Sequence, residues 1–156
     1  MSEIDIRLTR YGSRVANTLT TAALAELVQR YGGDGDSTPI LPGEFDPPGG
    51  GFLIAYDPDH EPIGCVGWRT LAEDEDTAEL KRMYVVPGHR GRGVAKALLV
   101  AVEDDARRSG RRRMWLETGT AQPEAIALYE RSGYVRIEDF GHYKEYEDVR
   151  SFGKDL

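Results

Sequence analysis

The segment that most constrains this chain is "VVPGHRGRGVAKALL", at residues 85–99. A strand-like apolar start runs into a turn and then into the apolar stripe of a helix. The turn holds three glycines and two arginines: Gly88, Gly91, Gly93, Arg90 and Arg92. A helix N-terminus leaves backbone N–H groups unpaired, glycine lets a ligand approach the backbone, and arginine adds charge-assisted donors. The segment therefore predicts a strand–turn–helix unit that binds an anion such as a diphosphate.

Two common phosphate-binding motifs fail at this turn. A Walker A loop has the pattern G-x-x-x-x-G-K-[ST]; Gly88 and Gly93 have the required spacing, but no lysine follows the second glycine. The dinucleotide fingerprint G-x-G-x-x-G begins correctly at Gly91, but Lys96 occupies the third glycine position. Glu117 lies at a suitable distance for a ribose contact, yet the strand "ELKRMYVV" is amphipathic rather than uniformly apolar. The turn therefore indicates neither a P-loop kinase nor a Rossmann protein.

The overall composition narrows the class of protein. A chain of 156 residues suits one domain, 1–156, and its net charge of −7 argues against nucleic-acid or anionic-membrane partners. No apolar run approaches the ~18 residues of a membrane span, and the charged N-terminus lacks a signal core, so we expect a cytoplasmic protein. The one cysteine, Cys65, lies in an apolar run and is expected in the core. Cysteine and histidine show no metal-ligand spacing, so no metal is expected.

Hydrophobic periodicity predicts an alternation of strands and helices. Strands are expected at 4–9, 51–57, 62–71, 77–86, 113–118, 134–138 and 149–156. Helices are expected at 20–33, 93–109 and 123–133. This order predicts an α/β (α+β) fold with a mixed sheet and helices on both faces.

Several segments carry more specific expectations. The acidic run 73–76 is expected as a solvated turn, and the Gly- and Pro-rich segment 32–50 as either a disordered or a substrate-facing loop. The basic run 106–113 is either a solvated helix end or a phosphate contact. The first helix is expected to bury a stripe of Leu24, Leu27, Val28 and Tyr31. Strict alternation along the strand 77–86 would separate Glu79, Lys81, Met83 and Val85 from Leu80, Arg82, Tyr84 and Val86.

A third motif fits the glycine turn. "RGRGVA" at 90–95 matches [QR]-x-x-G-x-[GA] after a strand that ends in V-x-P, and "ALYERSGY" at 127–134 follows it. Together these motifs resemble the GNAT superfamily of acetyl-CoA-dependent N-acetyltransferases, well over about residues 50–156 and loosely before them. The resemblance implies a GNAT-like, mixed and mostly antiparallel central sheet. Its central strands, 79–86 and 113–118, would splay apart around acetyl-CoA.

The resemblance also implies which residues bind acetyl-CoA (coenzyme A). The backbone of Met83, Tyr84 and Val85 would bond the pantetheine arm like an added strand, with the Met83 N–H directed at the thioester oxygen. Gln122 stands where many relatives have an asparagine that touches the cofactor. The diphosphate would be held by the Arg90 side chain and by the N–H groups of Gly91, Arg92, Gly93, Val94 and Ala95.

Two catalytic residues follow from the same resemblance. Glu79 aligns with a glutamate that acts as base in some GNAT enzymes; the alternative is a surface ion pair with Lys81 or Arg82. Tyr129 is the expected acid for the leaving thiolate, and the alternative is a core tyrosine. The implied activity is transfer of an acetyl group to the primary amine of a small molecule, amino acid or peptide.

The acceptor site is less determined. The candidates are Asp34, Asp36, Glu44 and Asp46 in the long loop and His142, Tyr143 and Tyr146 in the tail; solvated surface is the alternative. A non-catalytic acyl-CoA sensor, which would not need Glu79 or Tyr129, and transfer of a longer acyl group also stay open. The expected partner is a small-molecule or peptide amine, with no nucleic acid and no membrane. The sequence leaves a homodimer open.

Overall fold

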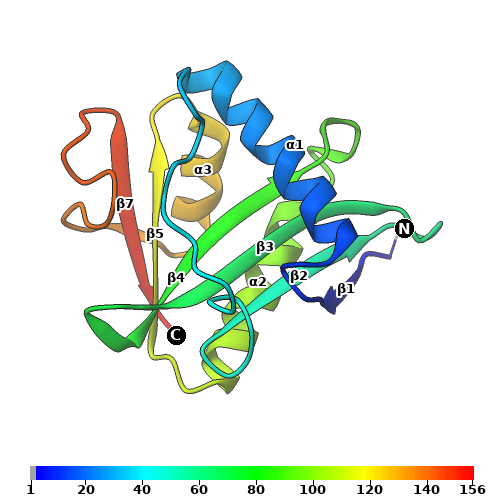
Figure 1. Cartoon of the computed structure of the whole chain (residues 1–156), viewed down its shortest axis with the longest axis horizontal. Helices are drawn as coiled ribbons and strands as arrows, with labels where there is room; N and C mark the ends of the chain where they lie inside the picture. Colours follow the sequence, from blue (N-terminus) through cyan, green and yellow to red (C-terminus); the bar gives the residue numbers. More distant parts are fainter. Residues whose placement is uncertain (1–2) are drawn as a thin grey trace.

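The computed structural model describes residues 3–156 as one seven-stranded sheet with three α-helices (Figure 1). The strands are β1 (Asp5–Leu8), β2 (Gly50–Tyr56), β3 (Pro62–Leu71), β4 (Asp74–Val85), β5 (Arg113–Gly119), β6 (Val135–Arg136) and β7 (Val149–Asp155). The helices are α1 (Arg14–Tyr31), α2 (Val94–Arg108) and α3 (Pro123–Arg131), with a short 3₁₀ turn at Pro87–His89. This is the mixed α/β architecture that the sequence predicted.

The sheet is antiparallel except at its centre. The strand order is β1-β2-β3-β4-β5-β7-β6, and only β4 and β5 are parallel neighbours. These two strands pair over three residues each, 77–79 with 113–115. Beyond this short ladder they diverge, as Figure 1 shows, which confirms the predicted splay. The separated ends leave room between the central strands.

The helices cover both faces of the sheet. On one face α1 packs over an apolar cluster that includes Phe52, Ile54 and Cys65. On the other face α2 and α3 cover the larger cluster, to which Leu98 and Tyr129 belong. Cys65 is fully buried, as expected, and burial raises the pKa of its thiol to about 12.

Helix α1 begins six residues earlier than the apolar pattern predicted. Ser13 caps it by accepting a hydrogen bond from the Ala16 N–H (3.2 Å). Its buried residues are Ala16, Leu19, Thr20 and Ala23. The predicted stripe is therefore wrong: Val28 is exposed, whereas Leu27 and Tyr31 line a cavity rather than the core. Small and polar residues in the first turns hid the start of this helix from a purely hydrophobic criterion.

A β-bulge in β4 corrects the predicted faces of that strand. Arg82 adopts a positive φ of 62°, and the register between β3 and β4 shifts between Cys65 and Gly67. The shift reverses the alternation, so Tyr84 packs under α1 whereas Met83 packs against the α2 face. Glu79 and Lys81 thus do not share a face with Met83.

Two connecting segments are more ordered than expected. β4 already begins at Asp74, so the solvated turn expected at 73–76 is shorter than predicted. The segment 32–49 inserts Phe45 into the core against Tyr11 and Phe52, with ring centroids 4.8 and 6.0 Å away. This anchor brings the acidic part of the segment over the sheet. None of the helices within residues 3–156 is both long and apolar enough to cross a bilayer.

Candidate functional site

Two cavities lie beside each other at the divergence of β4 and β5. The larger, about 790 Å³, is bounded by the end of β4, the start of α2 and α3. Ten of the predicted site residues line it: Met83, Tyr84, Val85, Arg90, Gly91, Gly93, Val94, Ala95, Gln122 and Tyr129. Arg92 and Glu79 lie outside this lining. The structure thus assembles most of the predicted cofactor residues around one space.

The glycine turn presents the N-terminus of α2 to the larger cavity without a side-chain cap. Gly91 and Gly93 have φ values of 76° and 83°, a region that favours glycine. A side chain at Gly88, Gly91 or Gly93 would meet no atom within 4 Å, so the backbone faces open space. The first turn of α2 also contains no acidic residue. These N–H groups are therefore free to bind an anion.

Arg90 forms the wall between this turn and α1. Its Nε donates to the Val85 carbonyl (2.9 Å), and its guanidinium pairs with Glu26 (2.8 Å) and lies 5.7 Å from the Tyr84 ring centroid. The pair with Glu26 holds the arginine at the edge of the cavity. A phosphate bound here would compete with Glu26 for the same guanidinium.

Tyr129 is buried on α3 yet reaches the larger cavity. Its side chain is packed edge-on against Tyr134 (5.7 Å between centroids), and the residue is 4% exposed. Burial raises the pKa of the phenol well above its usual value. Within residues 3–156, burial is the one cause of this shift, and no hydrogen bond to a neighbouring group contributes to it. The group is thus a protonated phenol at the cavity.

Glu79 is neither at the surface nor paired as expected. It lies opposite Arg69 in the β3–β4 register, and Arg69 Nε donates to Glu79 Oε1 (3.0 Å). Arg69 also binds Glu44 (2.9 Å) and the Pro39 carbonyl (2.8 Å). The alternative of a surface pair with Lys81 or Arg82 is therefore wrong, because Glu79 is buried and its partner comes from β3.

The smaller cavity, about 380 Å³, lies under the C-terminal half of α1 and the segments 32–37 and 143–149. Of the acceptor candidates, Asp34, Asp36, Tyr143 and Tyr146 line it. His142 lies outside this lining, with its Nε2 3.1 Å from Ser37 Oγ, and Glu44 forms an ion pair with Arg69. Gln122 lines both cavities, and its Oε1 accepts a hydrogen bond from the Tyr31 hydroxyl (3.2 Å). The two cavities therefore meet at Gln122.

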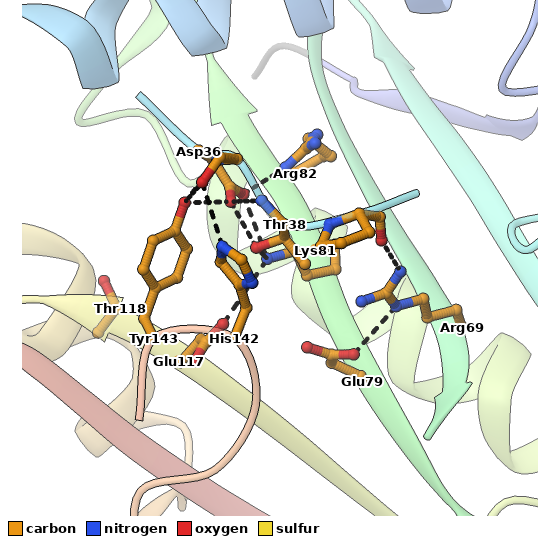
Figure 2. A network of polar contacts seen from close by, with 12 residues as sticks. Asp36, Thr38, Arg69, Glu79, Lys81, Arg82, Glu117, Thr118, His142 and Tyr143 are labelled. Atoms are coloured by element: carbon orange, nitrogen blue, oxygen red, sulfur yellow. Dashed lines mark hydrogen bonds and ion pairs between the residues drawn. The ribbon is translucent and has the colours of Figure 1, made fainter. Parts of the chain in front are cut away.

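A polar network closes the floor of the smaller cavity (Figure 2). Asp36 pairs with Lys81 Nζ (3.2 Å) and with Arg82, and accepts a hydrogen bond from the Thr38 N–H (3.0 Å). Burial opposes ionisation of Asp36, but Lys81, Thr38 and Arg82 hold its pKa well below its usual range. Asp36 is thus an ionised carboxylate whose negative charge is balanced by Lys81 and Arg82.

Glu117 was singled out in the sequence only as a ribose contact of the rejected dinucleotide fingerprint, and not as part of an acceptor cavity. It lies in Figure 2 beside Lys81, with Lys81 Nζ 3.9 Å from its Oε1. Its side chain is 5% exposed, and neither carboxylate oxygen has a hydrogen-bond partner among residues 3–156. Burial raises its pKa to about 7. Its position opposite the apolar face of "RMWLET" was the one signal available.

The comparisons with known proteins agree with this architecture. Residues 11–134 match the model of the Acetyltransferase (GNAT) family. The uncharacterized N-acetyltransferase YjgM of Escherichia coli is 32% identical over 121 residues, which cover 78% of this chain and 64% of that protein. The curated relatives it matches first are thus covered over about half to two thirds of their length. The chain belongs to the GNAT family of acetyltransferases.

Solved structures share the fold. A Klebsiella pneumoniae protein assigned to the acyl-CoA N-acyltransferases has a TM-score of 0.80 at 29% identity, with 98% of this chain and 97% of that chain covered. A GNAT family acetyltransferase from Elizabethkingia anophelis, solved with acetyl-CoA bound, has a TM-score of 0.70 at 19% identity, with 98% of both chains covered. The latter likeness is one of fold.

Proposed function

We propose that this protein transfers an acetyl group from acetyl-CoA to the primary amine of a small molecule, amino acid or peptide. The observation that carries the proposal is the larger cavity, about 790 Å³, with an uncapped helix N-terminus and the buried, protonated phenol of Tyr129 in its wall. An anion-binding end and a proton donor in one space suit a phosphate-bearing thioester. The GNAT membership supports acetyl-CoA as the co-substrate.

The residues present fit acetyl-CoA. The N–H groups of residues 91–95 and the Arg90 guanidinium would hold its diphosphate, with Arg92 adding positive charge from outside the cavity lining. Past its short pairing with β5, β4 has a free edge at Met83–Val85, where an extended pantetheine arm would bond like an added strand. Gln122, already bonded to Tyr31, would border the reacting end.

Direct attack of an amine on a thioester needs a proton acceptor and a proton donor. Tyr129 would donate a proton to the departing sulfur, because its raised pKa keeps it protonated at neutral pH. Glu79 is the base that the family resemblance implies, but its buried ion pair with Arg69 suits a structural role equally, so a second carboxylate beside the same strands is a competing candidate. The Met83 N–H would bind the thioester oxygen. We place this reaction in the cytoplasm and leave a homodimer open.

A screen of amines tests the proposal. Purified protein with acetyl-CoA is expected to release free CoA at least about tenfold faster with one class of primary amine than in buffer alone, and mass spectrometry should find an acetylated product. Tight CoA binding with no turnover on a broad amine set would instead support a non-catalytic acyl-CoA sensor. Propionyl- and butyryl-CoA in the same assay decide between acetyl and longer acyl groups.

A further inference from the structure

Glu117 lies at the point where the central strands separate. The last β4–β5 pair is Glu79 with Trp115, and Lys81 and Glu117 each follow two residues later. Because side chains alternate along a strand, Glu117 faces the α1 side, opposite Leu116 in the core under α2. The carboxylate therefore lies between the two diverging strands, in the wall of the smaller cavity.

Within residues 3–156, the buried Glu117 carboxylate has one distant ion-pair partner, Lys81, and no hydrogen bond. In the described part of the chain both oxygens are shielded from solvent and lack hydrogen bonds, and the Lys81 Nζ that pairs with Glu117 at 3.9 Å is itself bonded to Asp36 and Thr38. A buried carboxylate left in this way costs stability. Such a group is explained by a ligand that supplies the missing donor.

The remaining charges of the smaller cavity favour a cation. The charge of Asp36 is balanced by ion pairs with Lys81 and Arg82. Asp34 and Asp148, which also line the cavity, form no salt bridge within the described part of the chain. Lys81 is the sole cationic side chain among its described lining residues. Three tyrosines complete the wall, and their faces suit an ammonium group: Tyr31, Tyr143 and Tyr146.

We propose that the smaller cavity is the acceptor site for an amine that carries a second positive charge, and that Glu117 takes the proton from its reacting ammonium. The inference rests on the proposed function and specifies its acceptor. Asp34 and Asp148 would attract the distant cation, while Glu117 binds the near one beside Gln122, where the two cavities meet. The raised pKa of Glu117, about 7, suits a base that must accept and release a proton at neutral pH.

The transfer conserves protons and electrons. Glu117 removes one proton from the ammonium, and the nitrogen lone pair forms the C–N bond with the acetyl carbon. The C–S bond breaks, and its electron pair stays on sulfur, which takes the Tyr129 proton. The nitrogen gives its second proton back to Tyr129, and Glu117 releases its own to solvent. The products are the amide, free CoA and one proton.

Several charged groups surround Glu117 and act on its protonation. Burial raises its pKa most, Glu79 and Asp36 raise it further, and Lys81 and Arg69 oppose them. The same cavity adds Tyr31 from α1 and Tyr143 and Asp148 from the last long segment, beside His142. Because Glu117 must be ionised to act, kcat/KM is expected to fall as pH drops below about 7.

Substitution of Glu117 tests the base. Glu117→Gln is expected to lower kcat/KM about 10²–10³-fold at pH 7.5 and to abolish the fall near pH 7, with CoA affinity unchanged. Glu61→Gln, an exposed carboxylate on the β2–β3 turn, is the matched control and should retain full activity. If Glu117→Gln does not fold, Glu117→Asp should keep the inflection at reduced kcat/KM. The assignment of Glu117 as the base is overturned if Glu117→Gln keeps kcat/KM within threefold of wild type. It is also overturned if only the Glu79→Gln variant loses activity.

Matched acceptors test the substrate class. We expect kcat/KM for 1,5-diaminopentane to exceed that for pentylamine about tenfold or more, with 5-aminopentanoate poorest; a preference for the aminocarboxylate contradicts the inference. Calorimetry should show diamine binding to the wild-type protein that Glu117→Gln weakens about tenfold. If no amine turns over but this binding difference holds, the proposed function is wrong and the cation site is supported. If amines turn over without preference for the diamine, the proposed function is supported and the cation site is wrong.

Discussion

Tyr129→Phe is expected to reduce kcat about 10²–10⁴-fold while CoA affinity stays within about twofold of wild type. Within residues 3–156, burial alone raises the pKa of this hydroxyl and no hydrogen bond contributes, so we expect its removal to break no structural hydrogen bond. Its environment is apolar enough to raise the pKa of the phenol, so the loss of one buried polar atom should not destabilise the fold. Steady-state kinetics and calorimetric CoA titration measure the two quantities separately.

The control for this experiment is Tyr56→Phe, which removes a hydroxyl at the C-terminal end of β2, outside the lining of both cavities, and should leave kcat unchanged. Tyr129→Phe would contradict the acid assignment if it retained wild-type turnover. A parallel loss of CoA affinity would show instead that Tyr129 shapes the cavity, as the core-tyrosine interpretation holds. Because the phenol stays protonated in the neutral range, the variant should not shift the acidic limb of the pH profile.

Lys81→Met is expected to lower the free energy of unfolding by about 2–4 kcal/mol at pH 8. Lys81 is 6% exposed, and its Nζ lies 3.2 Å from Asp36 and 3.9 Å from Glu117. Its removal leaves two buried carboxylates with Arg82 as the remaining cationic neighbour of Asp36. Methionine preserves the volume of the stem, so the loss reports mainly on charge. Urea unfolding measures the change.

The penalty of Lys81→Met should shrink at pH 6. The folded-state pKa of Glu117 is about 7, above its ordinary value of 4.5, so the folded protein holds an extra proton between these values. Stability from this group is therefore present at low pH and lost as pH rises through about 7. Lys144→Met, on an exposed loop, should have no effect at either pH. An equal loss at pH 6 and pH 8 would show that Lys81 acts by packing alone.

The parts of the site that are local in sequence could be predicted. The glycine turn and the N-terminus of α2 depend on short-range patterns, so the local sequence was enough to predict an anion-binding helix start, whereas the place of Tyr129 beside it was predicted from the family resemblance. The mostly antiparallel sheet and the splay were predicted from the family resemblance, because neither strand alone indicates how β4 and β5 pair. The sequence could not decide between a disordered and a functional loop at 32–49, because its anchor, Phe45, is recognisable only from its burial in the core.

The predictions that failed depend on contacts distant in the chain. A single positive φ at Arg82 reversed the alternation of β4, and no residue type at that position marks a bulge. Glu79 pairs with Arg69 across two strands, ten residues away, rather than with its own neighbours. Glu117 is notable only because the fold buries its carboxylate without a hydrogen-bond partner among the residues that the structure describes. Burial and unsatisfied charge are properties of the folded chain, so periodicity could not report them.

The central claim is that the start of α2 binds the diphosphate of a coenzyme A thioester and directs its sulfur toward Tyr129. A crystal structure of the protein with CoA tests it most directly. We expect the diphosphate oxygens within hydrogen-bond distance, about 2.7–3.2 Å, of N–H groups in residues 91–95, and the sulfur beside the Tyr129 hydroxyl. CoA bound elsewhere, or a sulfur directed away from Tyr129 with the diphosphate off the glycine turn, would contradict the account.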